Sequence, residues 1–341
     1  MRAVILREYG GPERLEMGEI DVPTLGMNDV LIRLHAAGIN HIDHDMREGI
    51  SRLSPVLPHI LGTEGAGEIV EVGSGVSGAR VGDRVVPYNT FCGTCRHCLG
   101  GQENICPHRR QLGMHRWGTY ADYVVVHERE IVPIPAGMDY VTAAASTVCF
   151  GTAWNMAVSL GRLRAGETVL VNAAGSGVGS ASIQIAKLHG ARVIASAGSD
   201  EKLAKAIEIG ADQVVNYTRQ SIAREIPRLT DGAGVDLVIE SVGGTVLTDS
   251  IDALRPAGRL VTCGAHAGEE VNLNVVALFR KQIALLGNHY APRRHIATAL
   301  RLVAEDKLQP IVQAVMPLSD VREAAARTRD RNLFGKLVLT H

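Results

Sequence analysis

Between residues 168 and 287, short apolar segments recur at regular intervals, and several of them are separated by segments of helical periodicity. Helical examples are Val178–His189 and Glu201–Glu208. Strands that alternate with helices form a parallel sheet covered by helices, so this part of the chain is predicted to be a doubly wound α/β domain. The predicted strands are Thr168–Asn172, Arg192–Ser196, Gln213–Asn216, Val235–Glu240, Arg259–Cys263 and Ile283–Gly287.

A glycine-rich turn, Ala173–Gly179, follows the first of these strands and opens the next helix. The chain must reverse tightly there, and backbone N–H groups at the helix start then face the pyrophosphate of a dinucleotide. Gly177 and Gly179 permit close approach of the backbone to the ligand and of the helix to the strand. Together with six strands, this turn predicts a Rossmann dinucleotide-binding domain. We expect cofactor contacts from Gly175, Ser176, Gly177, Val178 and Gly179.

The second strand ends in Ala197-Gly198-Ser199, where NAD-binding domains usually place a carboxylate for the ribose hydroxyls. We therefore predict NADPH in preference to NADH. Two alternatives stay open: Asp200 could be the ribose ligand, although it is better explained as the start of the next helix, and Lys202 could be a solvated surface lysine. The remaining predicted cofactor contacts are Ser199, Lys202, Tyr217, Val242, Gly264, Asn288 and Lys336.

Four of the six cysteines fall within residues 92–106, in the pattern C-x2-C-x2-C-x7-C. Short gaps let neighbouring thiolates turn toward one centre, and the longer gap, which holds Gly100 and Gly101, lets the chain return with the fourth ligand. Four protein ligands leave no open coordination position, so we predict one structural zinc per chain. Disulfides and an iron–sulfur cluster are the alternatives. The predicted ligands are Cys92, Cys95, Cys98 and Cys106.

The length of 341 residues is typical of two domains, and 46% hydrophobic residues indicate a globular protein. A net charge of −1 argues against nucleic acid or an acidic membrane as the main partner. With no apolar run long enough to span a bilayer and no signal-peptide pattern, we expect a cytoplasmic protein with a small-molecule substrate. Before residue 130, strands are predicted at Val30–His35, Gly67–Val72, Asp83–Val86 and Tyr120–Val126.

In their order along the chain, these motifs resemble the zinc-type medium-chain dehydrogenase/reductase superfamily. The resemblance rests on residues 62–67 (GTEGAG), the four-cysteine segment, residues 118–123 (GTYADY) and the glycine turn. It is closest to the quinone oxidoreductase and enoyl reductase branch at residues 10–13, 38–43, 173–179, 195–199 and 216–217. The resemblance implies a GroES-like β-barrel catalytic domain (residues 1–130 and 289–341), a Rossmann domain (131–288) and assembly as a homodimer or homotetramer.

The chain departs from the alcohol dehydrogenases of this superfamily, which bind a catalytic zinc through a cysteine, a histidine and a third ligand. The matching positions hold Asn40, Thr63 and the neighbourhood of Val148. Asparagine and threonine are poor zinc ligands, so we expect the catalytic zinc to be absent. The sequence leaves open whether His41, His44 or Cys149 rebuilds a second metal site.

Hydride addition to a quinone or a conjugated double bond needs no Lewis acid, because the acceptor delocalises the charge and hydrogen-bond donors can stabilise the oxyanion. We therefore predict an NADPH-dependent reductase of such acceptors. An NAD(P)-dependent alcohol dehydrogenase with an atypical or lost zinc site, and a non-catalytic dinucleotide-binding protein, are the alternatives. The predicted catalytic residues are Asn40, Asp43, His44 and Thr63.

Overall fold

The computed structural model describes residues 1–50, 54–329 and 333–341, and the chain divides into two compact units. The first unit comprises Met1–Val148, Pro292–Asp306 and Pro310–His341, and the second comprises Cys149–Ala291 and Lys307–Gln309. Each unit has its own sheet and its own hydrophobic core.

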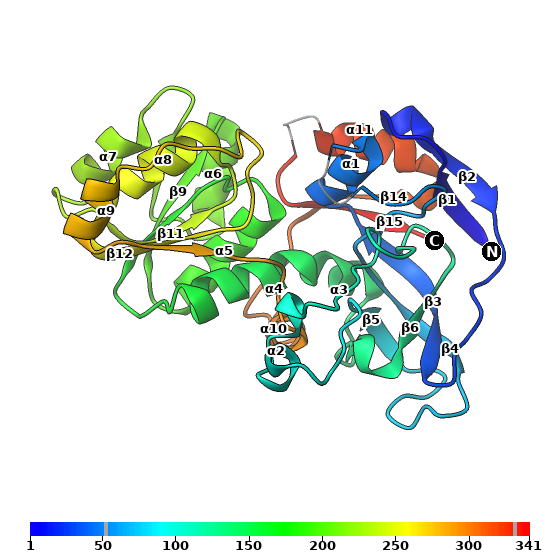
Figure 1. The fold of residues 1–341 in the computed structure, drawn as a ribbon. Helices are drawn as coiled ribbons and strands as arrows, with labels where there is room; N and C mark the ends of the chain where they lie inside the picture. Colours follow the sequence, from blue (N-terminus) through cyan, green and yellow to red (C-terminus); the bar gives the residue numbers. More distant parts are fainter. Residues whose placement is uncertain (51–53, 330–332) are drawn as a thin grey trace. The chain divides into compact units, whose positions relative to one another are not determined.

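The second unit is built on a six-stranded parallel sheet with the order β10-β9-β8-β11-β12-β13. This is the strand order of a Rossmann domain. The order in which consecutive strands are added to the sheet reverses between β8 and β11. Helix α5 lies on one side of the sheet, and α7 and α8 lie on the other (Figure 1). The strands are β8 (Thr168–Val171), β9 (Arg192–Ala197), β10 (Gln213–Asn216), β11 (Val235–Glu240), β12 (Leu254–Thr262) and β13 (Ala284–Gly287). The helices are α5 (Gly177–Leu188), α6 (Asp200–Glu208), α7 (Ile222–Leu229), α8 (Gly244–Asp252) and α9 (Val275–Lys281).

The first unit contains a seven-stranded sheet, in which six strands follow the order β14-β15-β3-β4-β5-β7 and β6 pairs with β3. A separate hairpin joins β1 to β2. The strands are β1 (Arg2–Leu6), β2 (Leu15–Glu19), β3 (Asp29–Gly38), β4 (Glu64–Val72), β5 (Arg84–Pro87), β6 (Tyr123–His127), β7 (Ile131–Pro133), β14 (Val312–Pro317) and β15 (Lys336–Thr340). The helices of this unit are α1 (His41–Glu48), α2 (Arg96–Leu99), α3 (Tyr140–Ser146), α10 (Arg293–Ala304) and α11 (Val321–Arg329), and α4 (Val148–Trp154) leads into the second unit.

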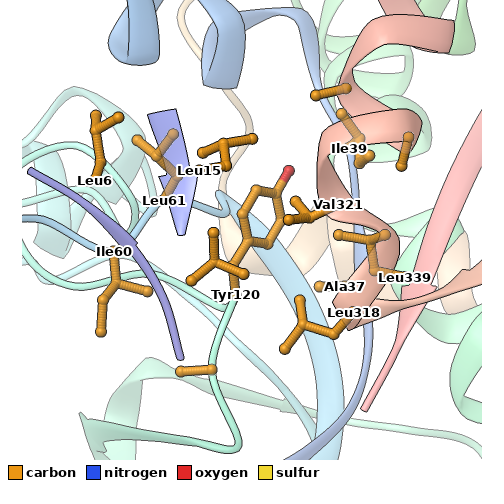
Figure 2. Packing of buried hydrophobic residues seen from close by; sticks show 14 of the residues in the cluster. Leu6, Leu15, Ala37, Ile39, Ile60, Leu61, Tyr120, Leu318, Val321 and Leu339 are labelled. Atoms are coloured by element: carbon orange, nitrogen blue, oxygen red, sulfur yellow. The ribbon is translucent and has the colours of Figure 1, made fainter. Parts of the chain in front are cut away.

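The core of the first unit joins residues from both ends of the chain. Figure 2 shows the Tyr120 ring at the centre of this cluster, with Leu15 and Leu61 from the N-terminal half and Val321 and Leu318 from the C-terminal end around it. The burial of these side chains on one another is the main reason why the C-terminal segment returns to the first unit.

The units divide at residues 148 and 149, later than the expected position near 130, because α3 packs on strands of the first unit. Tyr140 of α3 stacks on His35 of β3 with a ring-centroid distance of 4.4 Å, and the guanidinium of Arg84 lies 4.4 Å from the same ring. The second division, at residues 291 and 292, is close to the expected 289. No helix in the described ranges is long and apolar enough to cross a membrane.

Candidate active site

Three neighbouring strands of the first unit bring the polar residues of the candidate site together. In the antiparallel register, Gly38 of β3 lies opposite Val338 of β15 on one side and Glu64 of β4 on the other. Continuing the β3–β15 register by two residues places Lys336 opposite Asn40. The ideal Cβ of an alanine at residue 38 would lie 2.3 Å from Glu64 Oε1, so the missing side chain of Gly38 makes room for the carboxylate.

Lys336 is buried, and its ammonium group is fully committed to acceptors of the first unit. Its Nζ donates to the carbonyl of Ile39 and to Asn40 Oδ1, each at 2.7 Å, and forms an ion pair with Glu64 Oε1 at 2.5 Å. The side chains of Lys336 and Glu64 are only 5% and 1% exposed, so the ion pair is shielded from solvent. The prediction that Lys336 contacts the cofactor remains a prediction.

Glu64 is the acceptor at the centre of this network. Oε1 accepts from Asn40 Nδ2 at 2.9 Å as well as from Lys336. Oε2 accepts from the Thr147 hydroxyl at 2.5 Å and from the Val148 backbone at 2.8 Å. The Asn40 amide also donates to Thr63 Oγ1 at 3.1 Å. Asn40 and Thr63, two of the predicted catalytic residues, are therefore in direct contact.

Asp43, in the first turn of α1, contacts this network through the backbone of Asn40. Its Oδ2 accepts from the Asn40 backbone at 2.8 Å and from the Tyr120 hydroxyl at 2.9 Å. Burial raises the pKa of Asp43 to about 6, although these hydrogen bonds and the charge of Lys336 oppose the shift. Burial also raises the pKa of Tyr120, which keeps its hydroxyl a donor.

His44 occupies the next position of α1, and its ring makes contacts away from the Asn40–Thr63 pair. Arg47 donates to Nδ1 at 2.9 Å, so the opposite nitrogen Nε2 carries the proton and donates to the Thr328 hydroxyl at 2.7 Å. Burial, together with the neighbouring Arg47 charge, lowers the pKa of His44 to about 3. Because both nitrogens are engaged, the ring is a neutral structural group in this arrangement.

A hollow of about 460 Å³ also lies in the first unit. Its wall is formed partly by residues 114–117, which run next to residues 59–62: the backbone of Gly118 donates to Ile60, and that of Thr119 donates to Gly62. The lining residues are Ser54, Pro55, Val56, His59, Arg110, Met114, His115, Arg116 and Trp117.

In the second unit, the glycine turn has the geometry of a phosphate-binding turn. Ser176 caps α5 by accepting a hydrogen bond from the Gly179 backbone at 2.9 Å. A Cβ at Gly179 would lie 2.1 Å from the carbonyl oxygen of Ala173, so only glycine fits there. A Cβ at Gly175 would lie 2.8 Å from Cδ of Lys202, which places the Lys202 side chain over the turn. The first N–H groups of a helix have no carbonyl partner within the helix, so the N-terminus of α5 offers backbone donors beside a lysine.

The carboxyl ends of β9 and β10 hold the other predicted adenosine contacts. Ser199 caps α6, and Tyr217 lies beside Gly198, where an added Cβ would be 3.3 Å from the ring. Asp200 accepts from Asn216 Nδ2 at 2.6 Å and from Arg219 at 2.7 Å. Its carboxylate is therefore held by residues of the β10 end.

The ends of β11, β12 and β13 hold the last group of predicted cofactor contacts. Buried Glu240 accepts from the backbones of Val242 and Gly243 at 2.5 and 3.0 Å, and from the Thr262 hydroxyl at 2.9 Å. The Thr262 hydroxyl also lies 3.2 Å from the carbonyl of Gly264. Asn288 Oδ1 accepts from Asn155 at 2.6 Å, while its buried Nδ2 has no partner within the described ranges.

The four-cysteine cluster of the first unit has the geometry of a tetrahedral thiolate site. The Sγ atoms of Cys92 and Cys98 are 3.8 Å apart, those of Cys95 and Cys98 3.5 Å, those of Cys95 and Cys106 3.9 Å, and those of Cys106 and Cys92 3.6 Å. Zinc–sulfur bonds of about 2.3 Å in a tetrahedron set the sulfurs about 3.8 Å apart. These residues form no disulfide, and the backbone N–H groups of Thr94 and Cys95 lower the pKa of Cys92 to about 5. The four thiolates therefore fit a zinc ion.

The sequence did not indicate the partners of Lys336, Thr147 or Tyr120. Their positions depend on strand register and helix packing, for which no local motif exists. Glu64 was the available signal, because an acid at the start of a strand and directly before Gly65 is an unusual core residue.

Two family descriptions match the chain. "Alcohol dehydrogenase GroES-like domain" matches residues 26–136, and "Zinc-binding dehydrogenase" matches residues 177–305. The sequence is 31% identical to an NAD-dependent alcohol dehydrogenase of Sulfolobus acidocaldarius, over 99% of each chain. It is also 32% identical to a quinone oxidoreductase of Rattus norvegicus, covering 80% of this chain and 75% of the relative. Among solved structures, an NAD-dependent alcohol dehydrogenase superposes with a TM-score of 0.95 and 44% identity over the whole of both chains.

Proposed function

Because this chain belongs to the zinc-type medium-chain dehydrogenase/reductase superfamily, we propose that it is an NAD(P)-dependent oxidoreductase of the alcohol dehydrogenase type that works without a catalytic zinc. The observation that carries the proposal is the buried ammonium of Lys336, which is bonded to Asn40, at the position of a metal ligand in the family's zinc-binding enzymes, and to Glu64, the residue after Thr63. The relatives named alcohol dehydrogenase favour an alcohol–carbonyl pair as the substrate class.

The donor set favours hydrogen bonding over metal binding at this site. Amide and hydroxyl oxygens are weak ligands for zinc compared with thiolate and imidazole, and a lysine ammonium repels a metal cation. A bound nicotinamide supplies or accepts the hydride, and the protein must stabilise the charge that develops on the substrate oxygen. Thr63 is the residue of the network whose hydroxyl can donate to that oxygen.

Reduction of quinones or conjugated enones is the second candidate. It is favoured by the same donor set, because an acceptor that delocalises negative charge needs less stabilisation than a simple alkoxide. The similarity to a quinone oxidoreductase is consistent with it. Both candidate reactions require the substrate oxygen to lie beside Thr63. They differ in whether the substrate carbonyl is conjugated with a double bond.

A substrate screen separates these candidates. Nicotinamide absorbance is followed with benzyl alcohol and the oxidised cofactors, and with benzaldehyde, cyclohex-2-enone and 1,4-benzoquinone and the reduced cofactors. Faster turnover of the alcohol and aldehyde supports the first candidate, and faster turnover of the enone and quinone supports the second. Cofactor binding without any turnover would overturn both and support a non-catalytic binding protein.

For the cofactor we propose NADPH, although relatives are named NAD-dependent. No carboxylate follows β9 at residues 197–199, and the side chain of Asp200 is held by Asn216 and Arg219. Lys202 and Arg219 lie close to this end of the sheet and supply positive charge for a 2′-phosphate.

We also propose that the four-cysteine cluster binds one structural zinc, as its sulfur–sulfur distances and the zinc-binding family support. All four coordination positions are then protein thiolates, so the ion cross-links the chain and takes no part in hydride transfer.

Finally, we propose that two chains form a dimer through the edge of the parallel sheet in the second unit. Strand β13 is the edge strand, and Leu285 on it is 38% exposed. The adjoining helix α9 exposes Val275 and Phe279 by 60% and 61%. An exposed apolar edge strand is a template for pairing with a second chain.

A further inference from the structure

The residues next to Asn40 determine which atoms of its amide donate and which accept hydrogen bonds. A lysine ammonium can only donate, so the Asn40 oxygen must face Lys336. An ionised Glu64 can only accept, so the Asn40 nitrogen must face Glu64. The second hydrogen of that nitrogen points to Thr63 Oγ1 at 3.1 Å. The chain of donors therefore runs from Lys336 through Asn40 to Thr63.

Every donor of this chain except the last has its acceptors inside the protein. The three hydrogens of Lys336 have acceptors in Ile39, Asn40 and Glu64. Both hydrogens of Asn40 Nδ2 are used by Glu64 and Thr63. Thr63 Oγ1 accepts from Asn40, and its own hydrogen has no acceptor in the ranges that the structure describes. Asn40 therefore has no donor left for a substrate.

We infer that Thr63 donates the hydrogen bond to the substrate oxygen, and that Lys336 is a positioning residue that polarises and orients Thr63 through Asn40. This inference rests on the proposed function and names the part of the site that replaces the metal. Hydrogen bonds in a chain polarise one another, and the effect is largest where the chain starts on a charge and is buried. The Thr63 hydroxyl is then a stronger donor than an isolated threonine.

The reaction assigns each part of this network a task. When the substrate carbon, or the carbon conjugated with it, gains a hydride and its electron pair, the carbonyl oxygen becomes negative and accepts from Thr63. The oxygen then takes a proton from water, and the Thr63 hydrogen stays on Oγ1. In the opposite direction, the alcohol proton goes to water. Glu64 neutralises Lys336 and fixes it to Thr147 and Val148, so the donor is held in place before substrate arrives.

Substitution of Thr63 tests the final donor. Thr63→Val keeps the shape and removes the hydroxyl, and kcat should fall about 100-fold with the best substrate of the screen. Thr63→Ser keeps the hydroxyl and should stay within about threefold of the original kcat. Thr340→Val is the matched control, on β15 outside the network. An unchanged kcat for Thr63→Val, or equal losses for the valine and serine variants, would overturn the inference.

Substitution of Lys336 tests the positioning role with a readout besides activity. Lys336→Met should lower kcat about tenfold or more, while the NADPH dissociation constant, measured by nicotinamide fluorescence, changes less than threefold. Because a lone buried Glu64 can unfold the chain, Lys336→Met with Glu64→Gln is prepared as well. A tenfold loss of NADPH affinity in the folded variant would make Lys336 a cofactor ligand and overturn the inference. If the unsubstituted protein turns over no substrate, the proposed function fails, and the NADPH affinities alone decide the role of Lys336.

Discussion

At the level of single residues, buried histidines determine how the fold should respond to acid. Burial lowers the pKa of His44 to about 3 and those of His59 and His295 to about 4. Histidine in an unfolded chain titrates near pH 6.5, so between about pH 4 and 6.5 the unfolded state binds protons that the folded state does not. The unfolding free energy should therefore fall as the pH falls through this range.

Asp43 acts in the opposite direction over part of that range. Its raised pKa, about 6, means that the folded chain binds a proton between about pH 4 and 6 that the unfolded chain has lost. These three histidines and Asp43 together contribute a net difference of about two protons near pH 5, or about 2.7 kcal/mol per pH unit, to the slope of stability against pH. Urea unfolding at pH 5 and 6 measures this slope, and His59→Gln should reduce it by about one proton. A stability that is independent of pH would contradict the buried, neutral state of these rings.

Cofactor choice also depends on single residues. Lys202→Ala should lower the preference for NADPH over NADH about ten- to a hundredfold, because a charged hydrogen bond contributes about 1.5–3 kcal/mol. Lys205→Ala is a matched control on the same helix, where Lys205 pairs with Glu201 at 2.9 Å. Steady-state kinetics with both cofactors give the ratio. Equal effects of the two substitutions would remove Lys202 from the 2′-phosphate site.

At the level of secondary-structure elements, the close pairing of β3 with β4 depends on Gly38. Gly38→Ala places a Cβ 2.3 Å from Glu64 Oε1 and 2.8 Å from its Cδ, so the carboxylate must move away from Lys336. We expect the unfolding free energy to fall by about 1–3 kcal/mol, the usual cost of an overpacked core. Gly287→Ala is the control, because a Cβ there meets nothing within 4 Å. Urea denaturation should give a lower unfolding free energy for Gly38→Ala than for Gly287→Ala. Equal unfolding free energies would show that the Glu64 side chain can move aside without loss of stability.

The cysteine segment is a second element whose stability can be tested. Cys95→Ser removes one of four thiolates, and the zinc content should fall from about one per chain, with a lower melting temperature. Elemental analysis and thermal unfolding measure the two effects. Cys263→Ala lies outside the cluster and should leave the zinc content unchanged. Two zinc ions per chain before substitution would instead indicate a second, catalytic metal.

At the level of the whole molecule, the exposed edge of the parallel sheet leads to a prediction about assembly. Phe279→Asp places a charge on the apolar surface of α9 and should convert a dimer into monomers at micromolar concentration. Sedimentation velocity measures the mass, and Leu188→Asp on α5, where the leucine is 42% exposed, is the control. A dimer that survives Phe279→Asp would place the interface elsewhere.

Much of the second unit could be predicted from the sequence because its signals are local. The strands Gln213–Asn216 and Val235–Glu240 have the bounds that their apolar patterns predict, and the glycine turn lies where the sequence placed it. Strand β12 begins at Leu254, five residues earlier than predicted, because Leu254 already pairs with Val235 before an irregularity in the register, after which regular pairing resumes at Arg259. Helix α1 was not predicted. It is only eight residues long, most of them are polar, and it starts directly after the N-cap residue Asn40.

The sequence by itself determined the Rossmann order and the four-cysteine cluster, because each depends on residue type and short spacing. Only the tertiary structure decided which side chains surround Asn40 and Thr63. Lys336 lies 296 residues from Asn40 and 272 from Glu64, and no periodicity relates positions so far apart. The antiparallel register of β15 with β3 brings the ammonium to the site, and the absent side chain of Gly38 lets Glu64 reach it. The proposed role of Thr63 as the final donor depends on the direction of these hydrogen bonds, and that direction is set only when the partners are in contact.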